Sequence, residues 1–167
     1  DSIIIAVKNG QVDIGMSSFS VTEERKNAVD FTIPYFISGQ VLIARADSKF
    51  QSAADLKGKV VASGIGTTGE EAAMKMEGVT YKGLDDYTTA VMMLENGAVD
   101  GVVMDIAIAD GYVEKAGFVR VGDPLTYEET AIIVKKGNPS LVKALNAAIE
   151  KVKASGQLDT LRKKWGV

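Results

Sequence analysis

Residues 15–26 read Gly-Met-Ser-Ser-Phe-Ser-Val-Thr-Glu-Glu-Arg-Lys, and this segment is the most informative in the chain. The apolar residues Val12–Met16 predict a strand, which hydroxyl side chains and then Arg25 follow. Hydroxyl groups both donate and accept hydrogen bonds, and an arginine guanidinium matches a carboxylate with two parallel bonds. Such groups just past the carboxyl end of a strand are typical of a pocket for a small carboxylate.

Helix capping is a second interpretation of the same segment. Thr22 stands where it would cap a short helical turn that holds Glu23, Glu24 and Arg25. A cap of this kind requires no ligand. The local chemistry leaves both interpretations open.

Composition excludes several classes of function. The 167 residues are 46% hydrophobic, which is enough for the core of one ordinary domain or of two small lobes. Cysteine and histidine are both absent, which excludes disulfides, thiolate and histidine catalysis and most zinc sites. We expect neither a cofactor nor a metal. The net charge of −3, with no long basic run, argues against nucleic acid as a partner.

Several motifs together resemble a known family. Residues 17–25, followed by Val29-Asp30-Phe31-Thr32 and Pro34-Tyr35, are similar to the signature of polar amino-acid-binding proteins of ABC transporters. These are two-lobed extracellular solute receptors of the type II periplasmic-binding-protein class. Further matches follow in the family's order along essentially the whole chain: Asp55-Leu56-Lys57-Gly58-Lys59, Gly66-Thr67-Thr68-Gly69, the segment from Asp100 to Asp105, and Lys136-Gly137-Asn138-Pro139.

The resemblance implies an α/β fold of two lobes, each a mostly parallel sheet flanked by helices. We expect residues 1–43 and 131–167 to form lobe 1 and residues 44–130 to form lobe 2. The hinge crossings are expected near residues 41–46 and 129–134. In this fold a ligand touches both lobes and stabilises a closed state.

An internal similarity also favours two similar lobes. The segment Leu94-Glu95-Asn96-Gly97-Ala98-Val99-Asp100 repeats the pattern of Val7-Lys8-Asn9-Gly10-Gln11-Val12-Asp13, and an apolar strand follows each copy. In this register Ser18 aligns with Asp105, so each copy delivers a polar residue beyond a strand. Asp105 has an alternative role as the cap of a helix predicted over residues 106–115.

A glycine-containing turn, Gly66-Thr67-Thr68-Gly69, joins a strand predicted over 59–63 to a helix predicted over 70–76. Backbone N–H groups and the helix dipole at such a turn favour an anion. Alternatively, Glu70 and Glu71 stabilise the start of the helix with no ligand involved. The turn lacks the Gly-Lys-Ser/Thr ending of a phosphate loop.

The resemblance assigns these residues to the charged end of an α-amino acid. It implies that Arg25 binds the carboxylate, with Ser20 and the turn at Thr67 and Thr68 donating further hydrogen bonds. Asp105 is implied to receive the ammonium group, helped by oxygen atoms around Ser18. The pocket for the ligand's side chain is less defined, and its candidates by neighbourhood are Phe19, Gly64, Ile65 and Met104. Met104 has the alternative role of core packing. Ser17 and Gly66 are further expected ligand-binding residues.

The chain begins later than the resemblance implies for full-length relatives, which carry a further strand–helix–strand ahead of the position of Asp1. It shows neither an initiator methionine nor a secretory signal, and no apolar run approaches the ~20 residues that span a membrane. We therefore expect a processed or trimmed chain with an incomplete lobe 1. Either it is a fragment, or a second copy or a separate N-terminal fragment completes the lobe by swapping or dimerisation.

Binding without catalysis is the expected function. The resemblance implies delivery of a free amino acid to an ABC transporter permease, in the periplasm or at the extracellular face of the membrane, as a secreted or lipid-anchored protein. A cyclohexadienyl or arogenate dehydratase-like enzyme on the same scaffold is the alternative, and it needs an acid with a raised pKa. No second acid is clearly assigned to the pocket. A truncated receptor fragment that binds nothing is a third interpretation.

The last part of the chain predicts two helices. Asn138 caps the first helix and Pro139 occupies its first position. Leu158, Leu161 and Trp165 share one face of the second helix, so we expect Trp165 to anchor that helix to the protein.

Overall fold

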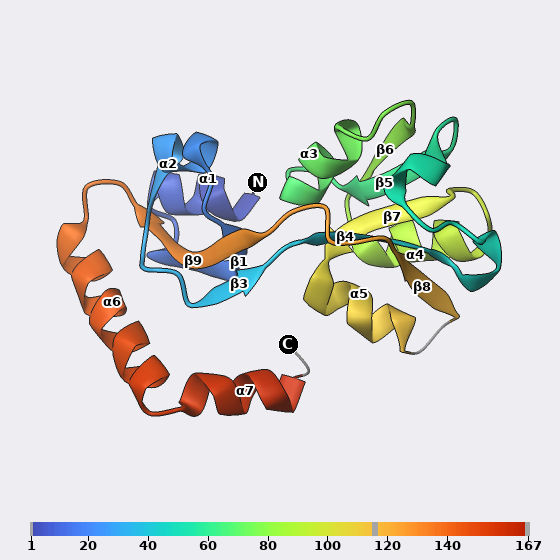
Figure 1. The fold of residues 1–167 in the computed structure, drawn as a ribbon. Helices are drawn as coiled ribbons and strands as arrows, with labels where there is room; N and C mark the ends of the chain where they lie inside the picture. The colour runs from blue at the N-terminus through green and yellow to red at the C-terminus, as the bar shows by residue number, and fades with distance from the viewer. Residues whose placement is uncertain (1, 115–116, 166–167) are drawn as a thin grey trace. The chain divides into compact units, whose positions relative to one another are not determined.

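The chain forms two compact units in the computed structural model, which describes residues 2–114 and 117–165 (Figure 1). Unit 1 comprises Asp1–Ile37 and Glu128–Val167, and unit 2 comprises Ser38–Tyr127. The expected α/β organisation into two lobes, with two crossings of the chain between them, is therefore present. Each unit is described by itself below.

The boundaries between the units fall earlier than residues 43/44 and 130/131, where the sequence placed them. The strand β4 (Gln40–Arg45) belongs to the sheet of unit 2, because it pairs with two strands of that unit. The strand β9 (Glu128–Lys135) pairs along its length in the sheet of unit 1. Hydrogen bonding assigns each crossing strand to the unit it enters.

Unit 1 contains a four-stranded sheet in which β1 (Ile14–Ser20), β9 and β2 (Val29–Phe31) are neighbours in that order, and β3 (Phe36–Ser38) also pairs with β9. Strands β1 and β2 both run antiparallel to β9. The core of the unit is formed by Val7, Phe19, Val29 and Ile133.

Four helices complete unit 1: α1 (Ser2–Asn9), α2 (Glu23–Ala28), α6 (Pro139–Ala154) and α7 (Gln157–Trp165). The predicted start of α6 is confirmed, since the Asn138 side chain accepts a hydrogen bond from the Leu141 N–H. The prediction that Trp165 anchors α7 is wrong: its side chain is 70% exposed. Amphipathic spacing on a short terminal helix did not lead to burial.

Unit 2 contains a five-stranded sheet of mixed direction (Figure 1). The strand order is β6 (Thr80–Leu84), β5 (Val60–Gly64), β7 (Gly101–Asp105), β4 and β8 (Phe118–Val121). Strands β6, β5 and β7 are parallel, whereas β4 runs antiparallel to β7 and β8.

The sequence predicted mostly parallel sheets, whereas β1 and β2 of unit 1 are antiparallel to β9 and the sheet of unit 2 is mixed. The physical reason is the same in both units: β4 and β9, the strands that follow the two crossings, each run against their neighbours. Parallel pairing is confined to the strands joined through helices, as a right-handed β-α-β connection requires.

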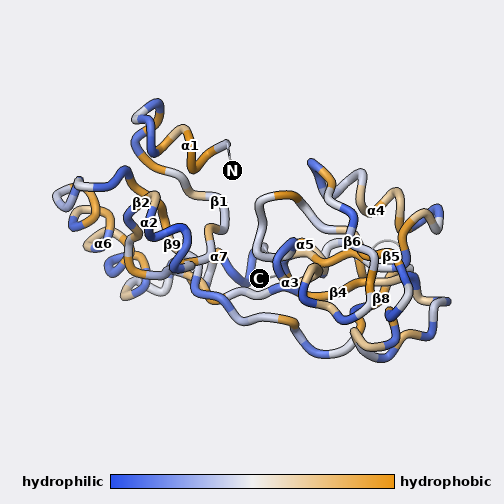
Figure 2. Tube along the Cα trace, turned by 90° about the horizontal axis from the view of Figure 1, so that it is seen from above, coloured by the Kyte–Doolittle hydropathy of each residue, from blue (hydrophilic) through white to orange (hydrophobic). Residues whose placement is uncertain are grey.

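Helices cover the sheet of unit 2 on both faces. The strand β4 therefore contributes side chains to two separate cores. Val41 and Ile43 enter one core, and Leu42 and Ala44 enter the other. This alternation is the period-two pattern of a strand buried on both sides, and the strands of unit 2 carry long hydrophobic segments in Figure 2. The helical elements are α3 (Thr68–Met74), α4 (Tyr87–Glu95), α5 (Ile106–Val113) and the 3₁₀ turns at Ala46–Ser48 and Ala53–Leu56.

The internal similarity corresponds to a repeated helix–turn–strand unit. Gly10 joins α1 to β1 with φ of 72°, and Gly97 joins α4 to β7 with φ of 74°. A left-handed residue after a helix favours glycine, which explains the matching Asn-Gly pairs. The helix predicted over 106–115 ends at Val113 in the structure, and Lys115 lies outside the described residues. Among the described residues, no helix is long and apolar enough to cross a membrane.

Candidate functional site

The hydroxyl-rich segment lies within a strand. Strand β1 begins at Ile14, two residues later than predicted, and continues through Ser20. The serines therefore lie within the strand and do not follow its end as expected. Its pairing with β9 shifts register between Gly15 and Phe19, and Ser18 has a φ of 50°. A bulge of this kind re-aims side chains and is common beside binding sites. Ser17 and Ser18 are exposed, whereas Phe19 and Ser20 are buried.

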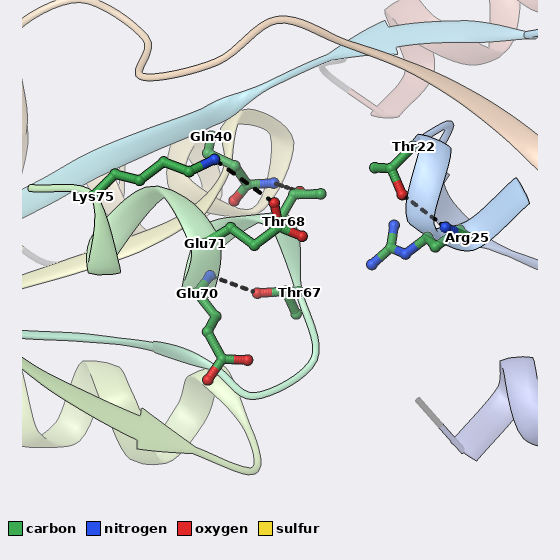
Figure 3. Close-up of polar contacts among 8 residues, drawn as sticks. All are labelled: Thr22, Arg25, Gln40, Thr67, Thr68, Glu70, Glu71 and Lys75. Carbon is green, nitrogen blue, oxygen red and sulfur yellow. Dashed lines mark hydrogen bonds and ion pairs between the residues drawn. The ribbon is translucent and has the colours of Figure 1, made fainter. Parts of the chain in front are cut away.

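Arg25 is positioned by contacts with β1 and by a helix cap. Its Nη1 donates to the Ser20 carbonyl oxygen at 3.1 Å, and its guanidinium carbon lies 6.0 Å from the centre of the Phe19 ring. Its backbone N–H donates to the Thr22 hydroxyl oxygen at 3.1 Å (Figure 3). The capping interpretation of Thr22 is therefore correct, and it is compatible with a binding role, because the cap uses the backbone of Arg25 and not its guanidinium.

Tyr35 supports the bulge from the next segment of the chain. Burial raises the pKa of the Tyr35 phenol, and a hydrogen bond with the Ser18 backbone opposes part of that rise. The phenol is therefore neutral at physiological pH, which suits its half-buried place. Sequence analysis quoted Tyr35 as part of a motif but gave it no contact with Ser18, because nothing in the sequence predicts the bulge.

The glycine-containing turn of unit 2 is held by its own side chains. The Thr67 hydroxyl donates to the Gly64 carbonyl oxygen at 2.7 Å and accepts from the Glu70 N–H at 3.1 Å (Figure 3). The Gly66 N–H donates to Glu70 Oε2 at 2.7 Å. Helix α3 begins at Thr68, two residues before the predicted start, so Thr67 is its cap. These bonds match the structural interpretation of the turn.

Glu70 also ties the turn to the edge of the sheet. Its Oε1 accepts a hydrogen bond from the Tyr81 hydroxyl at 2.9 Å. Burial, and then the hydrogen bond to Glu70, raise the pKa of Tyr81 well above its ordinary value. Tyr81 therefore remains a hydrogen-bond donor to Glu70 at every physiological pH.

Asp105 and Thr68 are brought together by Gln40, a residue that sequence analysis missed. Gln40 Nε2 donates to Thr68 Oγ1 at 3.1 Å (Figure 3) and to Asp105 Oδ1 at 3.3 Å, and Gln40 is 1% exposed. Asp105 stands at the start of α5, but its side chain makes no capping hydrogen bond, so the capping alternative is not what the structure shows. The available signal was a polar residue opening the apolar strand Gln40–Arg45.

The predicted site residues thus form two sets, one in each unit. Ser18, Ser20 and Arg25 are neighbours around the end of β1, and Gly66, Thr67, Thr68 and Asp105 lie at the ends of β5 and β7. The candidates for the side-chain pocket differ in burial: Phe19 and Met104 are in the cores, Gly64 is buried, and Ile65 is exposed. Ser17, a further expected ligand-binding residue, is also exposed. No group of acidic side chains in the described part of the chain is arranged to hold a metal ion.

Comparison with known proteins gives a consistent assignment. The profile of the bacterial extracellular solute-binding proteins, family 3, matches residues 1–167. The ABC transporter glutamine-binding protein GlnH of Bacillus subtilis (strain 168) is 35% identical over 162 residues, which is 95% of this chain and 59% of the relative. The chain therefore spans about three fifths of the length of that curated relative.

Solved structures are similar to this chain in both fold and sequence. An ancestral arginine-binding protein bound to arginine is 38% identical with a TM-score of 0.92, over 99% of this chain and 76% of that one. An ancestral amino-acid-binding protein described as a precursor of cyclohexadienyl dehydratase is 34% identical with a TM-score of 0.92, over 99% of this chain and 74% of that one. On the match along its whole length, the chain belongs to the bacterial extracellular solute-binding proteins, family 3.

Proposed function

We propose that the chain binds the charged end of an α-amino acid, with Arg25 taking the carboxylate and Asp105 the ammonium group. The observation that carries this proposal is the state of Asp105: it begins a helix without capping it, and its carboxylate is hydrogen-bonded to Gln40 at 3.3 Å. A carboxylate held in this way at a strand end is suited to an external cation.

The opposite charges of a zwitterionic amino acid favour one cationic and one anionic protein partner, here Arg25 and Asp105. Desolvating a carboxylate or an ammonium group is costly unless an opposite charge and hydrogen bonds replace the water. Arg25 offers the bidentate donor, and Ser18 and Ser20 supply further polar groups from β1. A ligand engaged by both sets gains contact energy when both units hold it, which is the thermodynamic basis of hinge closure.

A polar amino acid is the proposed ligand class, and transport is the proposed role. Members of the family named for glutamine, cystine, histidine and arginine all match nearly the whole chain. We propose that the protein works outside the cytoplasm, as the family description states for its members, and that it presents its ligand to the membrane permease of an ABC transporter.

Calorimetric titration of the chain with L-arginine, L-glutamine and L-histidine tests the proposal directly. Agmatine, which is arginine without its α-carboxylate, is the matched control for the role of Arg25. We expect at least one of the L-amino acids to bind and agmatine to bind at least tenfold more weakly than arginine if arginine is the ligand. Absence of heat with all three, confirmed by equilibrium dialysis, would contradict the proposal.

A dehydratase is the second candidate, favoured by the likeness to the precursor of cyclohexadienyl dehydratase. That ancestor is itself described as an amino-acid-binding protein, and the curated relatives are binding proteins, so we propose binding without catalysis. The discriminating assay is incubation with arogenate. Phenylalanine produced over many turnovers, and lost in Asp105→Asn, would establish the enzyme instead.

A further inference from the structure

Gln40 occupies a fixed place at the start of β4. Its backbone N–H donates to Thr126 Oγ1 at 3.0 Å, and its carbonyl oxygen accepts from the Leu125 N–H at 2.7 Å. In the sheet its direct partner across the antiparallel pair is Asp105. The backbone of Gln40 is thus fixed by these contacts, independently of those its side chain makes.

The orientation of the Gln40 amide follows from the chemistry of its neighbours. An ionised carboxylate only accepts hydrogen bonds, so the amide NH₂ must face Asp105. The same nitrogen donates to Thr68, as Figure 3 shows. The carbonyl oxygen Oε1 is consequently directed into the interior. There it is buried and has no hydrogen-bond partner among the described residues.

Glycine at position 69 leaves the space that this arrangement needs. A Cβ added at Gly69 would lie 2.8 Å from Gln40 Oε1 and 2.7 Å from the Ser63 hydroxyl oxygen. The Ser63 hydroxyl is committed elsewhere, because it donates to the Val103 carbonyl oxygen at 2.9 Å. The neighbouring residues therefore leave room for the Gln40 side-chain carbonyl but donate no hydrogen bond to it.

A buried carbonyl without a partner destabilises the folded protein, and an apolar side chain of similar volume would avoid that cost. The arrangement is accounted for if the amide donors are needed by Thr68 and Asp105. We propose that Gln40 is a positioning residue, which holds the Asp105 carboxylate in the orientation that receives the α-amino group of the ligand and is itself fixed by its second hydrogen bond to Thr68. This inference rests on the proposed function of Asp105.

The first test replaces Gln40 with methionine, which has similar volume and no amide, in the complete chain. Binding of L-arginine and L-glutamine is compared with that of 5-guanidinopentanoate and glutaramate, the same molecules without the α-amino group. We expect Gln40→Met to lower the affinity for the bound amino acid about tenfold or more and to leave the affinity for its analogue unchanged. The melting temperature should stay the same or rise, since the orphan carbonyl is removed.

Ser63→Ala is the matched control, because it removes a buried polar group on β5 whose hydroxyl donates to the Val103 carbonyl oxygen. It should change stability without changing the preference for the α-amino group. A merely structural role for Gln40 would lower the affinity for amino acid and analogue alike. Unchanged affinity in Gln40→Met at an unchanged melting temperature would overturn the proposal.

A second measurement needs no ligand. In ¹⁵N spectra of the unliganded chain, the side-chain amide protons of Gln40 should exchange slowly with water, and their resonances should move in Asp105→Asn. Fast exchange, or resonances insensitive to Asp105→Asn, would overturn the positioning role whether or not the chain binds an amino acid. If no amino acid binds but the Gln40 amide responds as expected, the proposed function fails while the Gln40–Asp105 linkage stands.

Discussion

At the scale of the residue, Arg25 has structural contacts, and we propose that its side chain also binds the ligand. Its backbone is fixed by the Thr22 cap, and its guanidinium is held against β1 by the Ser20 carbonyl and the Phe19 ring. Removing the charge-assisted bidentate contact in Arg25→Ala should cost about 2–3 kcal/mol of amino-acid binding, measured by calorimetry. Lys26→Ala is the control, since Lys26 pairs with the exposed Glu23 on the same helix and should bind ligand normally. Equal affinity in both variants would refute the assignment of Arg25.

Gly69 gives a prediction about packing at the same scale. Gly69→Ala introduces a methyl group against the Ser63 hydroxyl and the Gln40 amide, both of which are buried. Overpacking of this kind should destabilise the protein by about 1–3 kcal/mol, measured by urea denaturation. Gly111→Ala, at a helical position where nothing lies within 4 Å of the added Cβ, is the control and should be neutral or slightly stabilising. Equal stability of the two variants would contradict the close approach at Gly69.

At the scale of the element, helix caps connect stability to pH. The backbone N–H of Thr89, and then its hydroxyl, lower the pKa of Asp86, the cap of α4. A lowered folded-state pKa gives stability that is present above the ordinary value of 3.8 and is lost as pH falls through the folded value. Asp86→Asn should therefore be less stable at neutral pH and lose less stability below about pH 4. The same dependence of stability on pH in Asp86→Asn and in the parent would refute the cap effect.

Elements were predicted from sequence where local chemistry decides them. The strand predicted over 59–63 follows from its apolar pattern, and the start of α6 follows from the capping chemistry of Asn138. The bulge at Ser18 and the direction of β4 were not predicted, because both depend on pairing with strands distant in sequence. The contact of Gln40 with Asp105 was missed for the same reason.

At the scale of the whole molecule, the question is which residues unit 2 needs in order to fold. The predicted lobe 2, residues 44–130, omits the first part of β4 (Gln40–Arg45), which lies between β7 and β8 in the sheet of unit 2. We expect residues 38–127 expressed alone to unfold cooperatively by circular dichroism, and residues 59–127 to lack a cooperative transition. A cooperative transition in the shorter fragment would show that the central strand is dispensable.

Thermal unfolding of the chain with each common L-amino acid at millimolar concentration tests the central claim most directly. A ligand at about 100 times its dissociation constant adds about 2.7 kcal/mol of stability, which is visible as a higher midpoint. The account predicts a shift with one or a few polar amino acids, which disappears in Arg25→Ala and in Asp105→Asn. No shift with any amino acid, or a shift that persists in both variants, would contradict it.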